Sequence, residues 1–164
     1  MKTTILICCI PFICLAEEPL NPKIDYAGFV KMSQTLAPIR AAHRVSEEQF
    51  IEMAAAPRTV ILDARSKDRY ENIHIKGALH LALTDFTEAA LRALVPDLET
   101  PILIYCNNNF NNEPVNFPSK CLTVSLNIQT FINLHAYGYK NVYELAPLLD
   151  VKTTKIRFAG TSVK

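Results

Sequence analysis

The sequence lacks several patterns that would point to a functional class at once. It contains no tryptophan and no Cys-x-x-Cys pair, and its histidines, His43, His74, His80 and His135, do not follow a zinc-ligand spacing. The formal net charge is only +1, and neither sign of charge forms a long block. We therefore expect no nucleic-acid partner, no metal site and no bound cofactor.

What is present suffices for one globular domain, since the chain has 164 residues and 49% of them are hydrophobic. The first residues resemble a secretory signal, because Lys2 precedes an apolar run from Ile5 to Leu15 and Ala16 follows at a suitable cleavage position. That run is shorter than the about 20 residues of a transmembrane helix. We expect cleavage after Ala16, export to the periplasm, and no stable membrane insertion afterwards.

Cleavage would leave Cys106 and Cys121 in an oxidising compartment, too few cysteines for a disulfide scaffold. Cys106 follows Pro101 to Tyr105, an apolar run without helical periodicity that predicts a buried parallel strand. From Cys121 an apolar pattern of helical period runs to about Tyr137. The amino end of such a helix is positive and can face the carboxyl end of the strand, which would activate the Cys106 thiol.

Other segments complete an alternating pattern of strands and helices. Buried strands are predicted at residues 59–63, 101–105 and 141–145, with a shorter one at 79–83. Helices are predicted from Asp25, from Ser46 and over residues 84–95. Ser46 and Gln49 form a capping-box pattern, and Pro38 is expected to end or bend the first helix. The pattern predicts an α/β fold with a mostly parallel sheet flanked by helices.

Five short motifs occur in an order that resembles a single rhodanese-like domain. They are Asp63-Ala64-Arg65, Tyr70, His74-Ile75-Lys76-Gly77-Ala78, the strand ending in Cys106, and Gly138-Tyr139-Lys140-Asn141-Val142. The resemblance spans residues 45–146. It leaves a signal at 1–16, an N-terminal extension with a short helix at 17–44, and a tail at 147–164 that we expect to pack on the domain. It implies a five-stranded, largely parallel sheet with Cys106 at the catalytic position.

In that family the cysteine carries a persulfide sulfur. The resemblance thus implies a sulfurtransferase that takes sulfur from a small-molecule or protein donor and passes it to a thiophilic acceptor. The loop after Cys106 departs from the family pattern, because its fourteen residues before Cys121 contain neither glycine nor arginine and include six asparagines. Asparagine tolerates left-handed backbone and supplies hydrogen-bond donors. The residues expected to bind substrate are Asn107, Asn108, Asn109, Phe110 and Lys120.

Several roles stay open at this point. Asp63 and Arg65 either support the site or pair with each other, and His74 either supports the site or ties down a turn. Cys121 either resolves a persulfide on Cys106 or packs within its helix. We expect Cys106 to be the more reactive thiol. The alternatives to sulfur transfer are a noncatalytic binding module that uses the asparagine-rich loop and a thiol redox protein that uses both cysteines.

Overall fold

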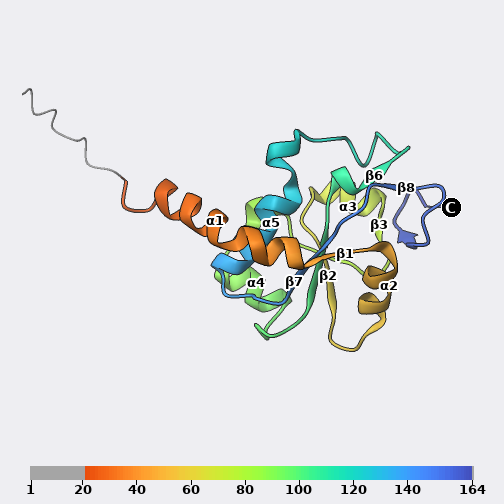
Figure 1. Ribbon diagram of the computed structural model, residues 1–164. Helices are drawn as coiled ribbons and strands as arrows, with labels where there is room; N and C mark the ends of the chain where they lie inside the picture. Colours follow the sequence, from red (N-terminus) through yellow and green to blue (C-terminus); the bar gives the residue numbers. More distant parts are fainter. Residues whose placement is uncertain (1–20, 164) are drawn as a thin grey trace, which may run out of the picture.

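The computed structural model describes residues 21–163, so the predicted signal at 1–16 lies outside the described residues. A five-stranded sheet with strand order β1-β7-β5-β2-β4 forms the centre of the domain (Figure 1). Its strands are Arg44–Val45 (β1), Val60–Asp63 (β2), Leu79–His80 (β4), Ile102–Tyr105 (β5) and Val142–Leu145 (β7). Every neighbouring pair is parallel, which confirms the predicted α/β fold.

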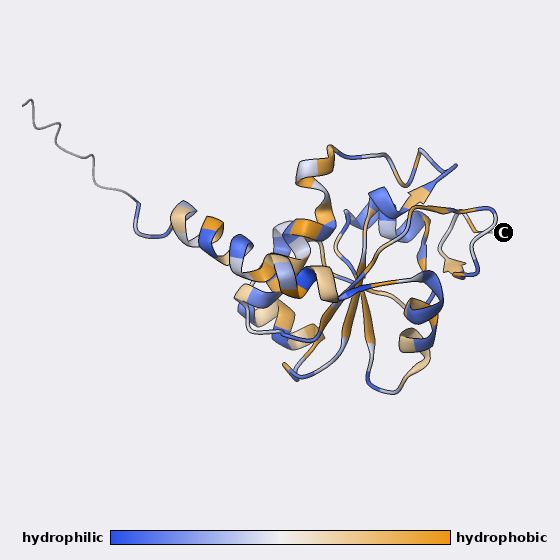
Figure 2. Cartoon of the chain, in the orientation of Figure 1, coloured by the Kyte–Doolittle hydropathy of each residue, from blue (hydrophilic) through white to orange (hydrophobic). Residues whose placement is uncertain are grey.

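Helices cover both faces of this sheet. The first face carries α1 (Tyr26–Ala42), α4 (Glu88–Leu94) and α5 (Leu126–Ala136), and the second carries α2 (Glu47–Ala55) and α3 (Lys67–Asn72) (Figure 1). The strands at the centre are strongly apolar, whereas the helices mix apolar and polar residues (Figure 2). This is the pattern of a sheet that is buried on both sides.

Side chains of a strand alternate between the two faces of its sheet. In β5, Ile102 and Ile104 lie in the core under α1 and α5, whereas Leu103 and Tyr105 lie in the core under α2. Cys106 is the next residue in this alternation. Its side chain is therefore directed toward the face that α1 and α5 cover.

The first helix is longer than expected. It runs for 17 residues and continues through Pro38. Proline removes one backbone hydrogen bond from a helix interior, but the last turns of α1 are held by packing. Leu36 is buried in the core shared with α5, and Arg40 pairs with Glu144 of β7. The opposite end of α1 projects away from the sheet (Figure 1).

The helix predicted from Cys121 begins later than expected. A short 3-10 turn, Leu122–Val124, comes first, and α5 starts at Leu126 after Ser125. It ends as predicted, because Gly138 adopts a φ of +94° that suits a helix C-terminus. The capping box of α2 is also confirmed. The backbone N–H of Gln49 donates to Ser46 Oγ at 3.2 Å, and the backbone N–H of Ser46 donates to Gln49 Oε1 at 2.9 Å.

The tail after residue 146 forms two small sheets with the body of the domain. β8 (Leu149–Asp150) pairs in parallel with β6 (Phe110–Asn111), and β9 (Phe158–Ala159) pairs antiparallel with β3 (His74–Ile75). The tail thus supports the loop that follows Cys106. Within residues 21–163, no helix combines the length and apolarity needed to cross a membrane.

Candidate active site

Cys106 lies at the carboxyl edge of the sheet, directly after β5. Its side chain is 1% exposed and lines a cavity of about 200 Å³. The Sγ atom lies 3.5 Å from Oγ of Ser125, the residue that precedes the first turn of α5. The amino end of a helix carries partial positive charge, and Ser125 brings that end of α5 next to the sulfur. The predicted approach of the helix to Cys106 is therefore confirmed, with Ser125 as the contact.

Asn109 holds the backbone around Cys106. Its Oδ1 accepts from the Cys106 amide at 2.9 Å and from Asn127 Nδ2 at 3.0 Å. Its Nδ2 donates to the carbonyls of Leu145 at 2.7 Å and Pro147 at 3.2 Å. With both ends of the amide engaged inside the protein, Asn109 positions the cysteine and the loop.

Two other loop asparagines also make bonds that close the loop. Asn108 Nδ2 donates to the Lys120 carbonyl at 2.9 Å, and the Lys120 amide donates back to Asn108 Oδ1 at 2.8 Å. Asn112 Nδ2 donates to Asp150 Oδ2 of the tail at 2.7 Å. The richness in asparagine thus serves largely to fold a loop that has no glycine.

Phe110 belongs to an aromatic cluster that anchors the loop. Its ring centroid lies 4.7 Å from that of Phe117 and 5.2 Å from that of Phe158, and both Phe110 and Phe117 are 2% exposed. This cluster lies in the core under α2. The alternation of β5 directs Cys106 to the opposite face of the sheet. Phe110 therefore packs on the other side of the sheet from the cysteine and anchors the loop there.

Asp63 and Arg65 form a buried ion pair on that same second face. Arg65 Nη2 donates to Asp63 Oδ2 at 2.6 Å, and Arg65 Nε donates to Asp63 Oδ1 at 3.0 Å. The guanidinium also donates to the carbonyls of Asn116 at 3.1 Å and Ile73 at 2.6 Å. Asp63 and Arg65 thus pair with each other, which was one of the two roles left open by the sequence. Arg65 also secures the loop after Cys106 through its bond to the Asn116 carbonyl.

Hydrogen bonds around this pair stabilise the charged form of Arg65. Burial opposes the charged form of Arg65, but the hydrogen bonds and negative charge of Asp63 outweigh burial and raise the pKa of Arg65 above its ordinary value. Tyr105 donates its hydroxyl hydrogen to Asp63. Burial, together with the charge of Asp63, raises the pKa of Tyr105 well above its ordinary value, so this hydroxyl stays a donor.

A second cavity has a volume of about 520 Å³ and shares no lining residue with the first. Asn107, Lys120, Arg65, Arg69 and Gln129 are among its lining residues. The predicted substrate-binding residues are therefore divided between two cavities. Asn108 and Asn109 line the cavity of Cys106, whereas Asn107 and Lys120 line the larger one.

His74 ties down a turn. Its Nδ1 lies 2.7 Å from the Tyr70 carbonyl, and its ring stacks on that of Tyr70 with centroids 4.0 Å apart.

Cys106 and Cys121 are both free thiols in the described part of the chain. Cys121 is exposed, and a hydrogen bond with Thr123 lowers its pKa. The expectation that Cys106 reacts faster with alkylators stays a prediction, and the exposure of Cys121 argues against it.

Sequence reasoning missed several side chains of the Cys106 cavity. The missed polar residues are Arg40, Arg44, Ser125, Asn127 and Glu144. Arg40 Nη2 lies 2.6 Å from Glu144 Oε1, although these residues are 104 positions apart. The sequence held one signal: Glu144 lies two residues after Val142, on the same buried face of its strand, where an unpaired carboxylate would be costly. No group of three or more potential metal-ligating side chains occurs within residues 21–163.

The family profile of the rhodanese-like domain matches residues 46–146, so this chain belongs to the rhodanese-like domain family. The chain is also 33% identical over 72 residues to the thiosulfate sulfurtransferase GlpE of Coxiella burnetii. That alignment covers 44% of this chain and 64% of the relative. Residues 21–45 and the tail lie outside the family match.

Solved structures share the fold at low sequence identity. The rhodanese-like domain of an Anabaena protein superposes with a TM-score of 0.53 at 19% identity, covering 73% of this chain and 80% of that one. A Bacillus halodurans protein superposes with a TM-score of 0.55 at 14% identity, covering 81% of this chain and 88% of that one. At these identities the similarity concerns the fold.

Proposed function

We propose that the chain is a sulfurtransferase in which Cys106 carries a persulfide sulfur. The observation that carries this proposal is the position of the Cys106 thiol. It lies at the carboxyl end of a central strand, 3.5 Å from Ser125 Oγ at the amino end of α5, and it lines a cavity. The similarity to a relative named as a thiosulfate sulfurtransferase supports the same chemistry.

The reaction would proceed in two displacements at sulfur. First, the Cys106 thiolate attacks the outer sulfur of a sulfane donor; with thiosulfate, a sulfur–sulfur bond forms at Cys106, the donor bond breaks, and sulfite leaves. Second, a thiophilic acceptor attacks the outer sulfur of the persulfide, and Cys106 leaves as a thiolate. The amino end of α5 and the Ser125 hydroxyl stabilise the negative sulfur in both steps.

Intact mass after incubation with thiosulfate tests this proposal. We expect the protein to gain about one sulfur atom, the Cys106→Ser variant to gain none, and the Cys121→Ser variant to behave like the parent. Addition of cyanide should then release thiocyanate and restore the original mass. A sulfur that resides on Cys121, or a full transfer rate in Cys106→Ser, would contradict the assignment.

The two alternative functions receive less support. A binding module built on the asparagine-rich loop needs free amides, but Asn108, Asn109 and Asn112 use theirs to fold the loop. A redox couple needs the two sulfurs to meet, and here Cys106 is buried while Cys121 is exposed. Their pairing stays a prediction, which mass under nonreducing conditions after mild oxidation would test.

We also propose that the chain is exported to the periplasm. This proposal depends on the sequence of residues 1–16, with its basic start, short apolar run and Ala16. Amino-terminal sequencing of the protein from a periplasmic fraction should begin at Glu17. Recovery of the chain in the cytoplasm with Met1 intact would contradict it.

A further inference from the structure

The positive charge of the Cys106 cavity comes from outside the region of the family match. Arg40 of α1 and Arg44 of β1 both line it, whereas the match begins at residue 46. The loop between Cys106 and Cys121 contains no arginine. Together with Glu144, these two arginines give the cavity lining a formal charge of +1. The N-terminal extension thus contributes directly to the environment of the cysteine.

Three residues that line this cavity each have a buried polar atom without a hydrogen-bond partner among the described residues. These atoms are Arg40 Nε, Glu144 Oε2 and Asn127 Oδ1. Glu144 is 5% exposed and Asn127 is 2% exposed. Such buried groups are costly unless something bonds to them. The residues around the cavity therefore keep one unused donor and two unused acceptors.

The hydrogen-bond network determines which end of Asn127 is unused. Asn109 Nδ2 donates to two backbone carbonyls, so Asn109 Oδ1 is the atom that accepts from Asn127. Asn127 must then donate with Nδ2, which leaves its Oδ1 as an acceptor. Both Asn127 Oδ1 and Glu144 Oε2 thus require a donor from the bound molecule.

A simple dianion such as thiosulfate has acceptors only, so it cannot satisfy either atom. A molecule with an ammonium group can donate to Glu144 Oε2 and Asn127 Oδ1, and a carboxylate on the same molecule can accept from Arg40 and Arg44. A volume of about 200 Å³ equals roughly seven water volumes, which suits a compact amino acid. The cavity is complementary to a small zwitterion.

We propose that the sulfur acceptor at Cys106 is a small zwitterionic aminothiol of the cysteine type. The proposal depends on the sulfurtransferase function proposed above. Glu144 and Asn127 bind the ammonium group, and Arg40 and Arg44 bind the carboxylate. These contacts orient the acceptor thiol toward the persulfide on Cys106.

The transfer step balances without a further reactant. The acceptor sulfur, as a thiolate, attacks the outer sulfur of the Cys106 persulfide and forms a new sulfur–sulfur bond. The bond between that outer sulfur and Cys106 Sγ breaks, and Cys106 leaves with the electron pair. The proton lost by the acceptor thiol ends on Cys106 or in solvent, so a thiol and a persulfide exchange one sulfur atom.

Binding to the Cys106→Ser variant tests recognition separately from sulfur transfer. Calorimetry would compare L-cysteine with cysteamine, which lacks the carboxylate, and with 3-mercaptopropionate, which lacks the ammonium group. We expect L-cysteine to bind at least tenfold more tightly than either. Equal affinity for all three thiols, or no binding of any, would overturn the proposal.

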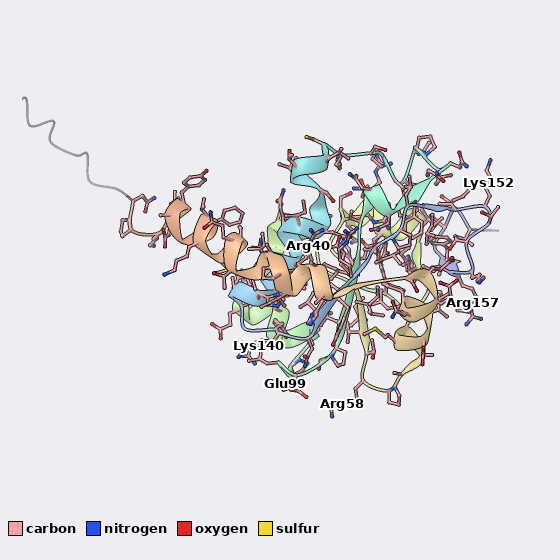
Figure 3. All side chains as sticks on the ribbon, viewed as in Figure 1. Arg40, Arg58, Glu99, Lys140, Lys152 and Arg157 are labelled. Carbon is pink, nitrogen blue, oxygen red and sulfur yellow. The ribbon has the colours of Figure 1, made fainter. Side chains whose placement is uncertain are left out.

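Charge-removing variants in the same background assign the contacts. Glu144→Gln should weaken binding of L-cysteine and cysteamine about tenfold and leave 3-mercaptopropionate within about twofold. Arg44→Gln should weaken L-cysteine and 3-mercaptopropionate and spare cysteamine. Glu48→Gln and Arg58→Gln are matched controls, because both side chains are exposed and belong to ion pairs outside this cavity. Figure 3 shows Arg40 near the middle of the domain and Arg58 at its far edge.

Two outcomes separate this inference from the proposed function. If the wild-type protein forms a persulfide but transfers it to the three thiols at equal rates, the acceptor assignment fails and the sulfurtransferase function stands. If selective binding is found but no persulfide forms with any sulfane donor, the sulfurtransferase function fails. Should Glu144→Gln not fold, Asn127→Ala removes the other ammonium acceptor and must show the same selectivity between thiols.

Discussion

Two arginine–carboxylate pairs lie on opposite faces of the same sheet, and they differ in how completely they are bonded. In the Asp63–Arg65 pair the side chains are 0% and 1% exposed, and Arg65 also donates to the Asn116 and Ile73 carbonyls. In the Arg40–Glu144 pair they are 27% and 6% exposed. Arg40 Nε and Glu144 Oε2 have no partner among the described residues.

This difference separates a structural pair from a pair at a binding site. Removing two charges from water is costly, and a buried pair recovers that cost only if further hydrogen bonds satisfy its remaining atoms. Asp63 and Arg65 meet this condition through backbone carbonyls and Tyr105. Arg40 and Glu144 do not meet it within the protein, which is expected where a bound molecule supplies the missing bonds.

The largest expected effect is the loss of one partner from the structural pair. Asp63→Ala should lower the free energy of unfolding by about 3–5 kcal/mol, because it leaves Arg65 charged and buried. Urea unfolding followed by circular dichroism measures this loss. The exposed Arg58–Asp97 pair supplies the control, since Arg58→Ala should change the free energy of unfolding by less than about 1 kcal/mol. Equal midpoints for Asp63→Ala and the wild type would contradict the comparison.

Replacing both members of each pair by apolar residues should separate stability from function. The Arg40→Met, Glu144→Leu double variant should stay within about 1 kcal/mol of the wild type, because apolar side chains can replace an incompletely bonded pair. Its sulfur transfer to L-cysteine should fall at least tenfold.

The matching Asp63→Leu, Arg65→Met variant should lose stability, since it also removes the bonds that secure the loop at Asn116 and Ile73. Urea midpoints and transfer rates together measure both double variants. If the two lose the same stability, the distinction between structural pair and site pair fails.

A smaller effect is expected at the contact between Cys106 and α5. Ser125→Ala removes the hydroxyl 3.5 Å from Cys106 Sγ, and one lost hydrogen bond of about 1.4 kcal/mol corresponds to a tenfold slower transfer. The melting temperature should change little. Ser33→Ala is the control and should leave the rate as it was, because the Ser33 hydroxyl donates to the Phe29 carbonyl within α1, away from Cys106. An unchanged rate in Ser125→Ala would remove Ser125 from the mechanism.

The smallest effect concerns Cys121, which lies outside both pairs and is exposed. Its thiolate should form at a lower pH than that of an ordinary cysteine, because Thr123 lowers its pKa by hydrogen bonding. Alkylation followed by peptide mass mapping should therefore label Cys121 before the buried Cys106. In Thr123→Val the rate profile of Cys121 should shift toward higher pH. Preferential labelling of Cys106 would instead indicate that its cavity opens readily.

Elements with strong local signals were predicted well. The strand before Cys106, the Ser46 capping box and the helix end at Gly138 each depend on neighbouring residues, so their patterns are visible in the sequence. The edge strand β1 was missed, because two residues cannot show an alternation. The site was predicted in part: Cys106 lines a cavity, but the expected substrate residues divide between two cavities.

The sequence by itself determined the longer strands and helices, though not β1 or α3, and the position of Cys106 at a strand end. These follow from side-chain periodicity and capping, which act over a few residues. Only the tertiary structure decided what surrounds the cysteine. The alternation of β5 and β7 directs Cys106 and Glu144 to one face, and the packing of α1 against α5 brings Arg40 to Glu144 across 104 positions. Such a contact has no local sequence pattern, because it depends on the sheet order and on which helices share a face.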